Sequence, residues 1–368
     1  MITVSLCMIV KNEEDSIERC LNSVCDIVDE IIIVDTGSND QTKAIVRKYT
    51  ERIYDFVWVD DFAAARNYAF NQASMQYIFW LDADDILMEK DRIMFAALKE
   101  TLAPSIDSVT MNYHLAFDEF GELTTSLRRN RLVKRSNHFQ WIGAVHEYLE
   151  VWGVIINSDI AVTHSSLHHD NDRNLRIYEN RLSHGEQFSP RDLYYFANEL
   201  LDHRRFEEAI SYYEKFLATG KGWVEDNISA CGKLADAFHK LGDHQNEFHS
   251  SLRSFQFGPP RAEFCCRIGY HFLDQNDIQS SIFWYTLATQ MELSNETWGV
   301  VNPVYSTWLP HLQLCVCYDR IGKYELAYQQ NEAARRYRPN DKRIIQNKSY
   351  LESKLGRESS GKGETGRV

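Results

Sequence analysis

Short apolar segments that end in polar turns constrain the fold of this chain more than any other feature. Residues Ile2–Val10 and Ile31–Val34 are mostly apolar, and between them apolar residues recur every three or four positions, which is the spacing of a helix. Two buried strands joined by a helix are typical of a βαβ unit and a parallel sheet. Ligands bind such sheets outside the carboxyl ends of the strands, so the sequence predicts an α/β domain with a binding crevice there.

The polar residues that follow these two strands are expected to face the crevice. They are Asn12, Glu13, Asp35, Gly37 and Ser38. Arg66 lies on a helix that leads into the next strand, and we expect it to meet a diphosphate. The alternatives are a turn-forming role for Asp35 and a surface ion pair for Arg66.

Three carboxylates gather where a further buried strand, Tyr77–Leu81, ends. They are Asp82, Asp84 and Asp85. Two unit charges about 4 Å apart interact by roughly 4 kcal/mol at an effective dielectric of about 20. The cluster therefore indicates a divalent metal, a basic partner or a raised pKa, unless Asp84 or Asp85 caps the following helix.

From about Ser189 the chain changes to helical hairpins with little strand signal. The residues that open the second helix of each hairpin are Phe206, His244, Ile278 and Tyr324, at successive offsets of 38, 34 and 46 residues. These offsets are close to the 34-residue period of tetratricopeptide units with insertions. The sequence thus predicts an α/β domain over residues 1–186, a tetratricopeptide-like helical repeat domain over 187–355 and a disordered polar tail over 356–368.

Composition disfavours several classes of function. The formal net charge of −13 and a pI near 5.5 disfavour a nucleic-acid or anionic-membrane binder. The apolar runs are too short to span a bilayer, and no secretory signal opens the sequence, so we expect a cytoplasmic protein. The eight cysteines lack the spacing of a zinc site and are expected to be reduced core residues.

The strand ends Lys11-Asn-Glu-Glu14, Val34-Asp-Thr-Gly-Ser38 and Leu81-Asp-Ala-Asp84 together resemble the GT-A fold of family 2 glycosyltransferases. The resemblance continues through Gly143-Ala-Val-His-Glu147 and His164 into the helical repeats. This order is similar to bacterial family 2 enzymes with a helical-repeat tail, including the glycocin peptide glycosyltransferases. It implies a GT-A domain with a mixed, mainly parallel sheet, followed by an all-α repeat domain.

The resemblance implies a UDP-sugar donor with Mn²⁺ or Mg²⁺ as the cofactor. Asp82 and Asp84 match the DXD motif that holds the metal on the donor diphosphate, and His164 matches a late histidine that completes the site. Asp35 matches an acid that contacts the nucleobase, while Thr36 stands where the family often has a second acid. The donor-binding residues expected are Val10, Asn12, Glu13, Asp35, Gly37, Ser38, Arg66, Asp82, Ala83, Asp84 and Asp85.

Three of these roles depend on details of position. We expect Asp85 to reach the sugar hydroxyls, and His146 and Glu147 to occupy the position of the catalytic base, with Glu147 preferred because inversion needs a base within reach of the acceptor's proton. A strand-end pair that orients Arg131 or the loop is the alternative for His146 and Glu147. A satisfied core histidine is the alternative for His164.

These expectations combine in an inverting, metal-dependent glycosyltransferase. The enzyme would move a hexose, with glucose favoured, from a UDP-sugar to a cysteine or serine of a peptide such as a glycocin precursor. The repeats would bind the peptide or form a homodimer. The alternatives are a family 2 enzyme for a cell-surface polysaccharide or lipid-linked acceptor, and a non-catalytic repeat scaffold.

Overall fold

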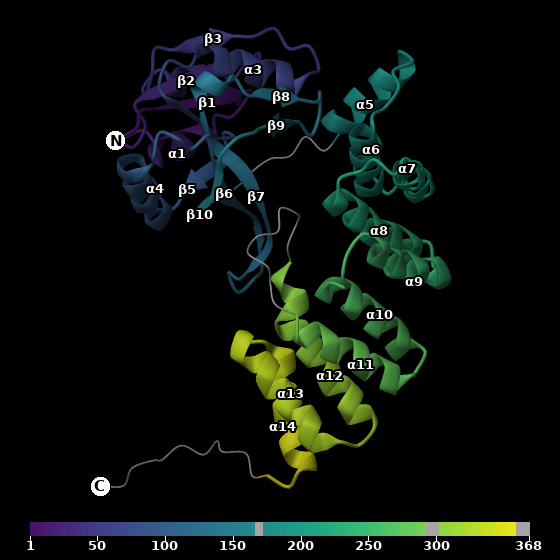
Figure 1. Ribbon diagram of the computed structural model, residues 1–368. Helices are drawn as coiled ribbons and strands as arrows, with labels where there is room; N and C mark the ends of the chain where they lie inside the picture. Colours follow the sequence, from purple (N-terminus) through teal and green to yellow (C-terminus); the bar gives the residue numbers. More distant parts are fainter. Residues whose placement is uncertain (166–171, 292–301, 358–368) are drawn as a thin grey trace, which may run out of the picture. The chain divides into compact units, whose positions relative to one another are not determined.

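The computed structural model describes residues 1–165, 172–291 and 302–357, and the chain divides into two compact units (Figure 1). The first unit runs from Met1 to Leu200 and the second begins at Leu201. This division falls inside helix α6 (Pro190–Asp202), beyond the boundary expected after residue 186. The expected tail lies outside the described residues from residue 358 onward.

A mixed sheet of eight strands organises the first unit, in the order β3-β2-β1-β4-β7-β6-β10-β5. Its strands are β1 (Val4–Val10), β2 (Glu30–Asp35), β3 (Ile53–Asp55), β4 (Tyr77–Trp80), β5 (Asp85–Leu87), β6 (Ser108–Phe117), β7 (Leu123–Lys134) and β10 (Ile155–His164). Strand β1 is parallel to both β2 and β4, and β2 is parallel to β3. The carboxyl ends of β1, β2 and β4 therefore lie at one edge of the sheet, as expected.

Helices and a small hairpin cover the sheet because both of its faces are apolar. The covering elements are α1 (Ile17–Asn22), α2 (Thr42–Val46), α3 (Phe62–Gln72), α4 (Glu89–Thr101), β8 (Gln140–Ile142) and β9 (Tyr148–Glu150), and α5 (Arg173–Ser183) and α6 follow them in the chain. Alternate strand residues enter different cores: Leu6 and Phe79 pack with Phe95 of α4, whereas Trp80 packs with Trp141 of β8. This explains the continuous apolar runs in the sequence.

The strands at the other side of the sheet are antiparallel or differ from expectation. The sequence predicts a hairpin turn at residues 119–122 and a strand at residues 131–135. Strands β6 and β7 form this hairpin, and β7 begins well upstream of residue 131. Residues 53–58 also predict a strand, and in the structure this strand, β3, ends at Asp55. Strand β5 was not predicted; it pairs antiparallel with β10 and sets His164 directly opposite Asp85.

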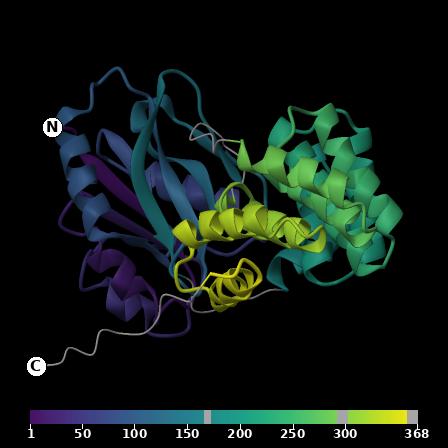
Figure 2. The ribbon, with the colours of Figure 1, turned by 90° about the horizontal axis from the view of Figure 1, so that it is seen from below.

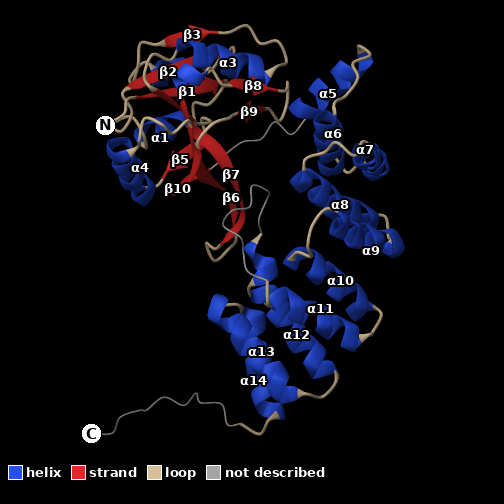
Figure 3. Ribbon diagram, viewed as in Figure 1, coloured by secondary structure: helices blue, strands red, loops and turns tan. Residues whose placement is uncertain are grey.

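The second unit contains helices without any strand in the part of the chain described (Figure 2 and Figure 3). Its helices are α7 (Phe206–Ala218), α8 (Val224–Lys240), α9 (His244–Arg253), α10 (Ala262–Asp274), α11 (Ile278–Thr289), α12 (Trp308–Arg320), α13 (Tyr324–Tyr337) and α14 (Lys342–Lys354). Helices α8 and α9, α10 and α11, and α12 and α13 pack as hairpins. The four predicted starts of second helices are confirmed, since α7, α9, α11 and α13 begin at those residues.

The turns before these four helices share one backbone conformation. Each contains a residue with a positive φ, namely Arg204, Gly242, Asn276 and Gly322. The amide of that residue donates to the carbonyl oxygen three positions earlier, over distances of 2.9 to 3.1 Å. Left-handed residues close helix C-termini in this way, so one turn geometry recurs through the repeats.

Two further expectations concern the cysteines and the membrane. All eight cysteines are free thiols, and all but Cys25 are buried, which agrees with the expected core role. Among the described residues, none of the helices carries an apolar stretch long enough to cross a bilayer.

Candidate functional site

The loops after β1 and β2 are tied together by hydrogen bonds. The amide of Asn12 donates to Ser38 Oγ over 3.0 Å, and the amide of Asn39 donates to Asn12 Oδ1 over 2.9 Å. The amide of Glu13 donates to Thr42 Oγ1 over 2.7 Å. The predicted residues Asn12, Glu13 and Ser38 therefore meet at the edge of the sheet where the two strands end.

Asp35 fixes the turn after β2. Its Oδ2 accepts hydrogen bonds from the amides of Gly37 and Ser38, each over 3.1 Å, and the residue is only 1% exposed. Gly37 has a φ of 102°, a conformation that favours glycine. Val10 is also buried, and its carbonyl accepts from the amide of Thr36. Asp35 thus forms the turn after β2, and its contact with a nucleobase stays a prediction.

Glu13 links the first loop electrostatically to the acidic strand end. Burial raises the pKa of Glu13, a hydrogen bond from Ser16 opposes this effect, and the charges of Asp84 and Asp82 add to it. Ala83, between the two aspartates, is buried at 4% exposure and offers no side chain to a ligand. The loops after β1 and β4 therefore share one acidic environment.

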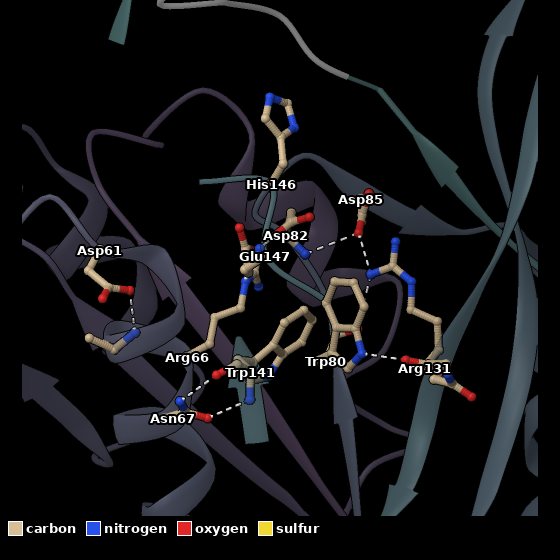
Figure 4. Close-up of polar contacts among 12 residues, drawn as sticks. Asp61, Arg66, Asn67, Trp80, Asp82, Asp85, Arg131, Trp141, His146 and Glu147 are labelled. Carbon is tan, nitrogen blue, oxygen red and sulfur yellow. Dashed lines mark hydrogen bonds and ion pairs between the residues drawn. The ribbon is translucent and has the colours of Figure 1, made fainter. Parts of the chain in front are cut away.

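Arg66 of α3 joins Asp82 to Glu147 (Figure 4). Its Nη2 lies 2.6 Å from Asp82 Oδ1, and its Nε lies 2.5 Å from Glu147 Oε1. The guanidinium packs 4.8 Å from the centre of the Trp141 ring and 5.1 Å from that of Trp80. Burial acts to raise the pKa of Asp82, yet the charge of Arg66 holds that pKa below its usual range. Arg66, expected at a diphosphate, is thus already paired with two carboxylates.

Two local features of α3 hold Arg66 in place. Asp61 caps the helix, its Oδ1 accepting from the amide of Ala64 over 2.9 Å. Asn67 is next to Arg66. Its side-chain amide donates to the carbonyl oxygen of Trp141 over 2.9 Å, and its Oδ1 accepts from the amide of Trp141 over 2.8 Å (Figure 4). These bonds fix β8 against α3 and so place the 143–147 loop beside the acidic strand end.

Asp85 is a buried structural acid. Its Oδ2 lies 3.0 Å from Nη1 of Arg131 and accepts from the amide of Asp82 over 3.0 Å. Arg131 is enclosed between the rings of Trp80 and Tyr113, at 3.9 and 4.4 Å from their centres. Both Asp85 and Arg131 have 0% exposure. The side chain of Asp85 faces the protein interior and braces the turn, and its contact with sugar hydroxyls stays a prediction.

The candidate metal group consists of Asp84, Asp85 and His164, whose ligand atoms lie within 4.8 Å of one another. His164 Nδ1 is 3.4 Å from Asp84 Oδ1 and 3.7 Å from Asp85 Oδ1. The neighbouring carboxylates of Asp84 and Asp85 raise the pKa of His164 to about 10. The expected set had Asp82 in place of Asp85, but Asp82 pairs with Arg66 instead.

This group fits a divalent cation. Asp85 Oδ1 is buried and has no hydrogen-bond partner among the described residues, and such an atom is costly unless a ligand completes it. Carboxylate oxygens suit Mg²⁺ and Mn²⁺, and the imidazole of His164 favours a transition metal such as Mn²⁺.

His146 and Glu147 point in opposite directions from their loop (Figure 4). The left-handed φ of 50° at His146 turns its ring away from Arg66 and Asp82. The ring stacks on Tyr195 of α6 at 4.3 Å, and its Nε2 lies 2.7 Å from Glu199 Oε1. Glu147 faces the acidic strand end, whereas His146 docks the loop onto α6, so the structure does not bring the His146 ring to the acids.

Three residues that shape the site were not predicted. Tyr113 approaches His164 Nδ1 with its hydroxyl at 3.1 Å, while Glu199 holds His146 and accepts a hydrogen bond from Asn174. A signal for Tyr113 existed, because alternate residues of β6 are apolar and buried. Glu199 carries no local signal, since it lies on a helix far along the sequence from His146.

Comparison with known proteins assigns the class of the first unit. Residues 5–146 match the family described as Glycosyl transferase family 2, and these residues contain the interlocked loops, the acidic strand end and Arg66. The chain thus carries a family 2 glycosyltransferase domain, and the resemblance seen in the sequence is confirmed.

Three relatives are similar to parts of this chain. The chain is 29% identical over 236 residues to the SPbeta prophage-derived glycosyltransferase SunS of Bacillus subtilis, covering 58% of this chain and 53% of SunS. It is 49% identical over 88 residues to the TPR repeat-containing protein Synpcc7942_0270 of Synechococcus elongatus, covering 24% and 22%. It is 29% identical over 177 residues to the lipopolysaccharide core biosynthesis glycosyltransferase LpsC of Rhizobium meliloti, covering 45% and 63%. The chain spans less than two thirds of the length of each relative.

Proposed function

We propose that this protein transfers a hexose from a UDP-sugar, UDP-glucose first, to a cysteine or serine side chain of a peptide, with inversion at the sugar carbon. One observation carries the proposal: the loops after parallel strands β1 and β2 and the acidic end of β4 converge beside the group Asp84, Asp85 and His164. A sheet edge of this kind is where α/β domains bind nucleotides. The reaction needs a site for a diphosphate and an acceptor base, and this edge offers both.

The donor would lie along the loops after β1 and β2. Asn12 and Ser38 hold these loops together and Asp35 shapes the second turn, so their role is to build the nucleotide cradle. Asp84 and His164, with Asp85 behind them, would hold Mn²⁺ or Mg²⁺. When bound, the ion supplies Lewis-acid stabilisation of the charge that develops on the departing diphosphate.

The acceptor's proton would be taken by Glu147. Its carboxylate lies in the same ion-pair group as Asp82 and is 11% exposed, and Arg66 fixes its orientation. Arg66 also keeps Asp82 ionised beside the donor site. His146 and Glu199 would act on the base indirectly, by anchoring the loop that carries it.

The resemblance of the sequence to the glycocin peptide glycosyltransferases supports a peptide acceptor, and the helical hairpins of the second unit offer a surface of the type that binds extended peptides. Similarity to LpsC favours a second candidate, a saccharide acceptor. We propose the peptide first because the resemblance to the peptide glycosyltransferases continues into the helical repeats. A cytoplasmic location and a homodimer are part of this proposal.

Nucleotide release from UDP-glucose with Mn²⁺ tests the donor assignment. We expect turnover by the wild-type chain, its loss on chelation of Mn²⁺ with EDTA, and a decrease of about 100-fold in Asp84→Ala and His164→Ala. Glu119→Gln, an exposed acid in the β6–β7 turn, is the matched control and should retain full turnover. Equal turnover by the two site variants and the control contradicts the donor site.

The acceptor is tested separately by intact mass. A panel of peptides containing cysteine or serine, and a panel of oligosaccharides, would each be incubated with enzyme and donor. A gain of one hexose on a peptide supports the proposal. A gain on the oligosaccharides alone overturns the peptide acceptor and leaves the glycosyltransferase site intact.

A further inference from the structure

Besides the group in the first unit, the described residues bring one other set of metal-ligating side chains together, in the α8–α9 hairpin. His239 lies in the last turn of α8, His244 opens α9, and Glu247 lies one turn further along α9. The side chains of the two histidines are 44% and 60% exposed, and that of Glu247 is 21% exposed. The set is therefore accessible from solvent.

The three side chains converge on one point. His239 Nδ1 lies 3.1 Å from Glu247 Oε2, and His244 Nδ1 lies 2.9 Å from the same oxygen. In tetrahedral coordination with bonds of about 2.0 to 2.1 Å, neighbouring ligand atoms are about 3.3 Å apart. The nitrogen and oxygen atoms are thus close to the spacing that Zn²⁺ requires, and only small side-chain rotations are needed to reach it.

The backbone holds this arrangement without a ligand. Gly242 has a φ of 75°, and its amide donates to the carbonyl of His239 over 3.0 Å. The amide of Asp243 donates to the carbonyl of Phe238 over 2.9 Å, and Asp243 Oδ1 accepts from the amide of Asn246. The end of α8 and the start of α9 are therefore both capped by hydrogen bonds. This order in the backbone lowers the entropy cost of bringing the three side chains to one ion.

The other repeats show that helix packing does not require these residues. The position of Glu247 is occupied by Ala209 in α7, Ser281 in α11 and Ala327 in α13, all with 0% exposure. The position of His244 is occupied by Phe206, Ile278 and Tyr324. The shared turn therefore works with small or apolar residues, and the two histidines and the carboxylate are a departure confined to the α8–α9 hairpin.

We propose that His239, His244 and Glu247 form a binding site for a transition-metal ion, with Zn²⁺ preferred. Two imidazoles and one carboxylate suit Zn²⁺ far better than Mg²⁺, and three protein ligands leave the fourth position for water. The ion links the end of α8 to the start of α9. The competing explanation is ion pairing between Glu247 and protonated histidines alone, which predicts no bound zinc at this hairpin.

Isothermal titration calorimetry of the full chain with zinc chloride tests the site. Because the first unit can also offer ligands, the quantity to compare is the number of zinc ions bound per chain. We expect His244→Ala and Glu247→Gln each to bind one ion fewer than wild type, or to bind it at least tenfold more weakly. His249→Ala removes an exposed histidine of the same helix outside the set and should match wild type. Equal zinc binding by all four proteins overturns the proposal.

Thermal unfolding supplies a second readout. Zinc should raise the Tm of wild type and His249→Ala more than the Tm of the ligand variants, since a ligand that binds only the folded state stabilises it. If circular dichroism shows that a variant is misfolded, His239→Ala, on the other helix, replaces it. An equal zinc-induced shift in His239→Ala and wild type also counts against the site.

Discussion

Asp85 and Arg131 form an ion pair with 3.0 Å between Oδ2 and Nη1, and neither side chain is exposed to solvent. The pair adjoins the candidate metal group, because Asp85 is a member of both. Asp85 also accepts a hydrogen bond from the amide of Asp82. The acidic strand end is thus held by a cation from β7 that is 46 residues away in the sequence, which lets one carboxylate be buried while Asp84 remains accessible.

Removal of Arg131 alone should destabilise the first unit strongly. Arg131→Met leaves Asp85 as an uncompensated buried charge, and we expect a loss of about 3 to 5 kcal/mol in the free energy of unfolding. Urea unfolding followed by circular dichroism measures this loss. The double variant Arg131→Met with Asp85→Asn should recover much of it, because no buried charge is left. A single variant as stable as the double variant would contradict the pairing.

Glu147→Gln should separate donor binding from transfer. Because the amide cannot accept the acceptor's proton, we expect kcat for transfer to fall by about 100-fold or more, while the KM for UDP-glucose changes less than about twofold. Steady-state kinetics with saturating peptide gives both values. Glu150→Gln, an exposed acid at the end of β9, is the control and should keep both. A rise in KM with unchanged kcat would show that Glu147 binds donor instead.

Glu199→Gln should loosen the loop that carries Glu147. The glutamine keeps the size of the side chain but loses the carboxylate that His146 and Asn174 contact. We expect kcat to fall by about tenfold, less than in Glu147→Gln, together with faster amide hydrogen exchange over residues 143–147. A kcat decrease with exchange rates equal to wild type would mean that Glu199 does not act through the loop.

The ion pair of Asp192 and Arg181 should make stability depend on pH. Burial acts to raise the pKa of Asp192, but hydrogen bonds from Arg181 and Ser189 lower it below the ordinary value overall. A lowered pKa in the folded state stabilises the protein above the unfolded-state pKa of about 3.9, and this contribution is lost as the pH falls through the folded-state value.

Asp192→Asn should therefore be about 1.5 to 3 kcal/mol less stable than wild type at pH 7. The difference should narrow as the pH falls below about 4, where the wild-type carboxyl also becomes neutral. Urea unfolding at pH 7, 5 and 3 measures it. A difference that stays constant over this range would assign the effect to side-chain shape rather than to charge.

The sequence predicted what depends on local pattern. The strands up to Leu81, the hairpin of β6 and β7, and the starts of the four second helices follow from apolar spacing and turn chemistry. The convergence of Asn12, Ser38 and Asp82 also followed, because parallel strands present their carboxyl ends together.

The pairing of strands that are far apart in the sequence could not be predicted from local pattern. Strand β5 is three residues long and begins at a carboxylate, so nothing in its composition indicates that it pairs with β10. That pairing places Asp85 next to His164 and, with Arg131, decides which acids are buried. The direction of the His146 ring depends on one left-handed residue, which local propensity does not specify.

Strand β5 is the outermost strand of the sheet, and His164 occupies the last position of β10 opposite its first residue. Side chains of a strand alternate between faces, so a slip of one residue between β5 and β10 would turn His164 away from Asp84 and Asp85. Most of the apolar core would survive that slip, because most of its residues lie on other strands and on the helices. The chemistry of this edge therefore depends on the register of a ladder of only three residue pairs, and insertions near Asp84 or Ser165 would separate the side chains of the candidate metal group while the fold is kept.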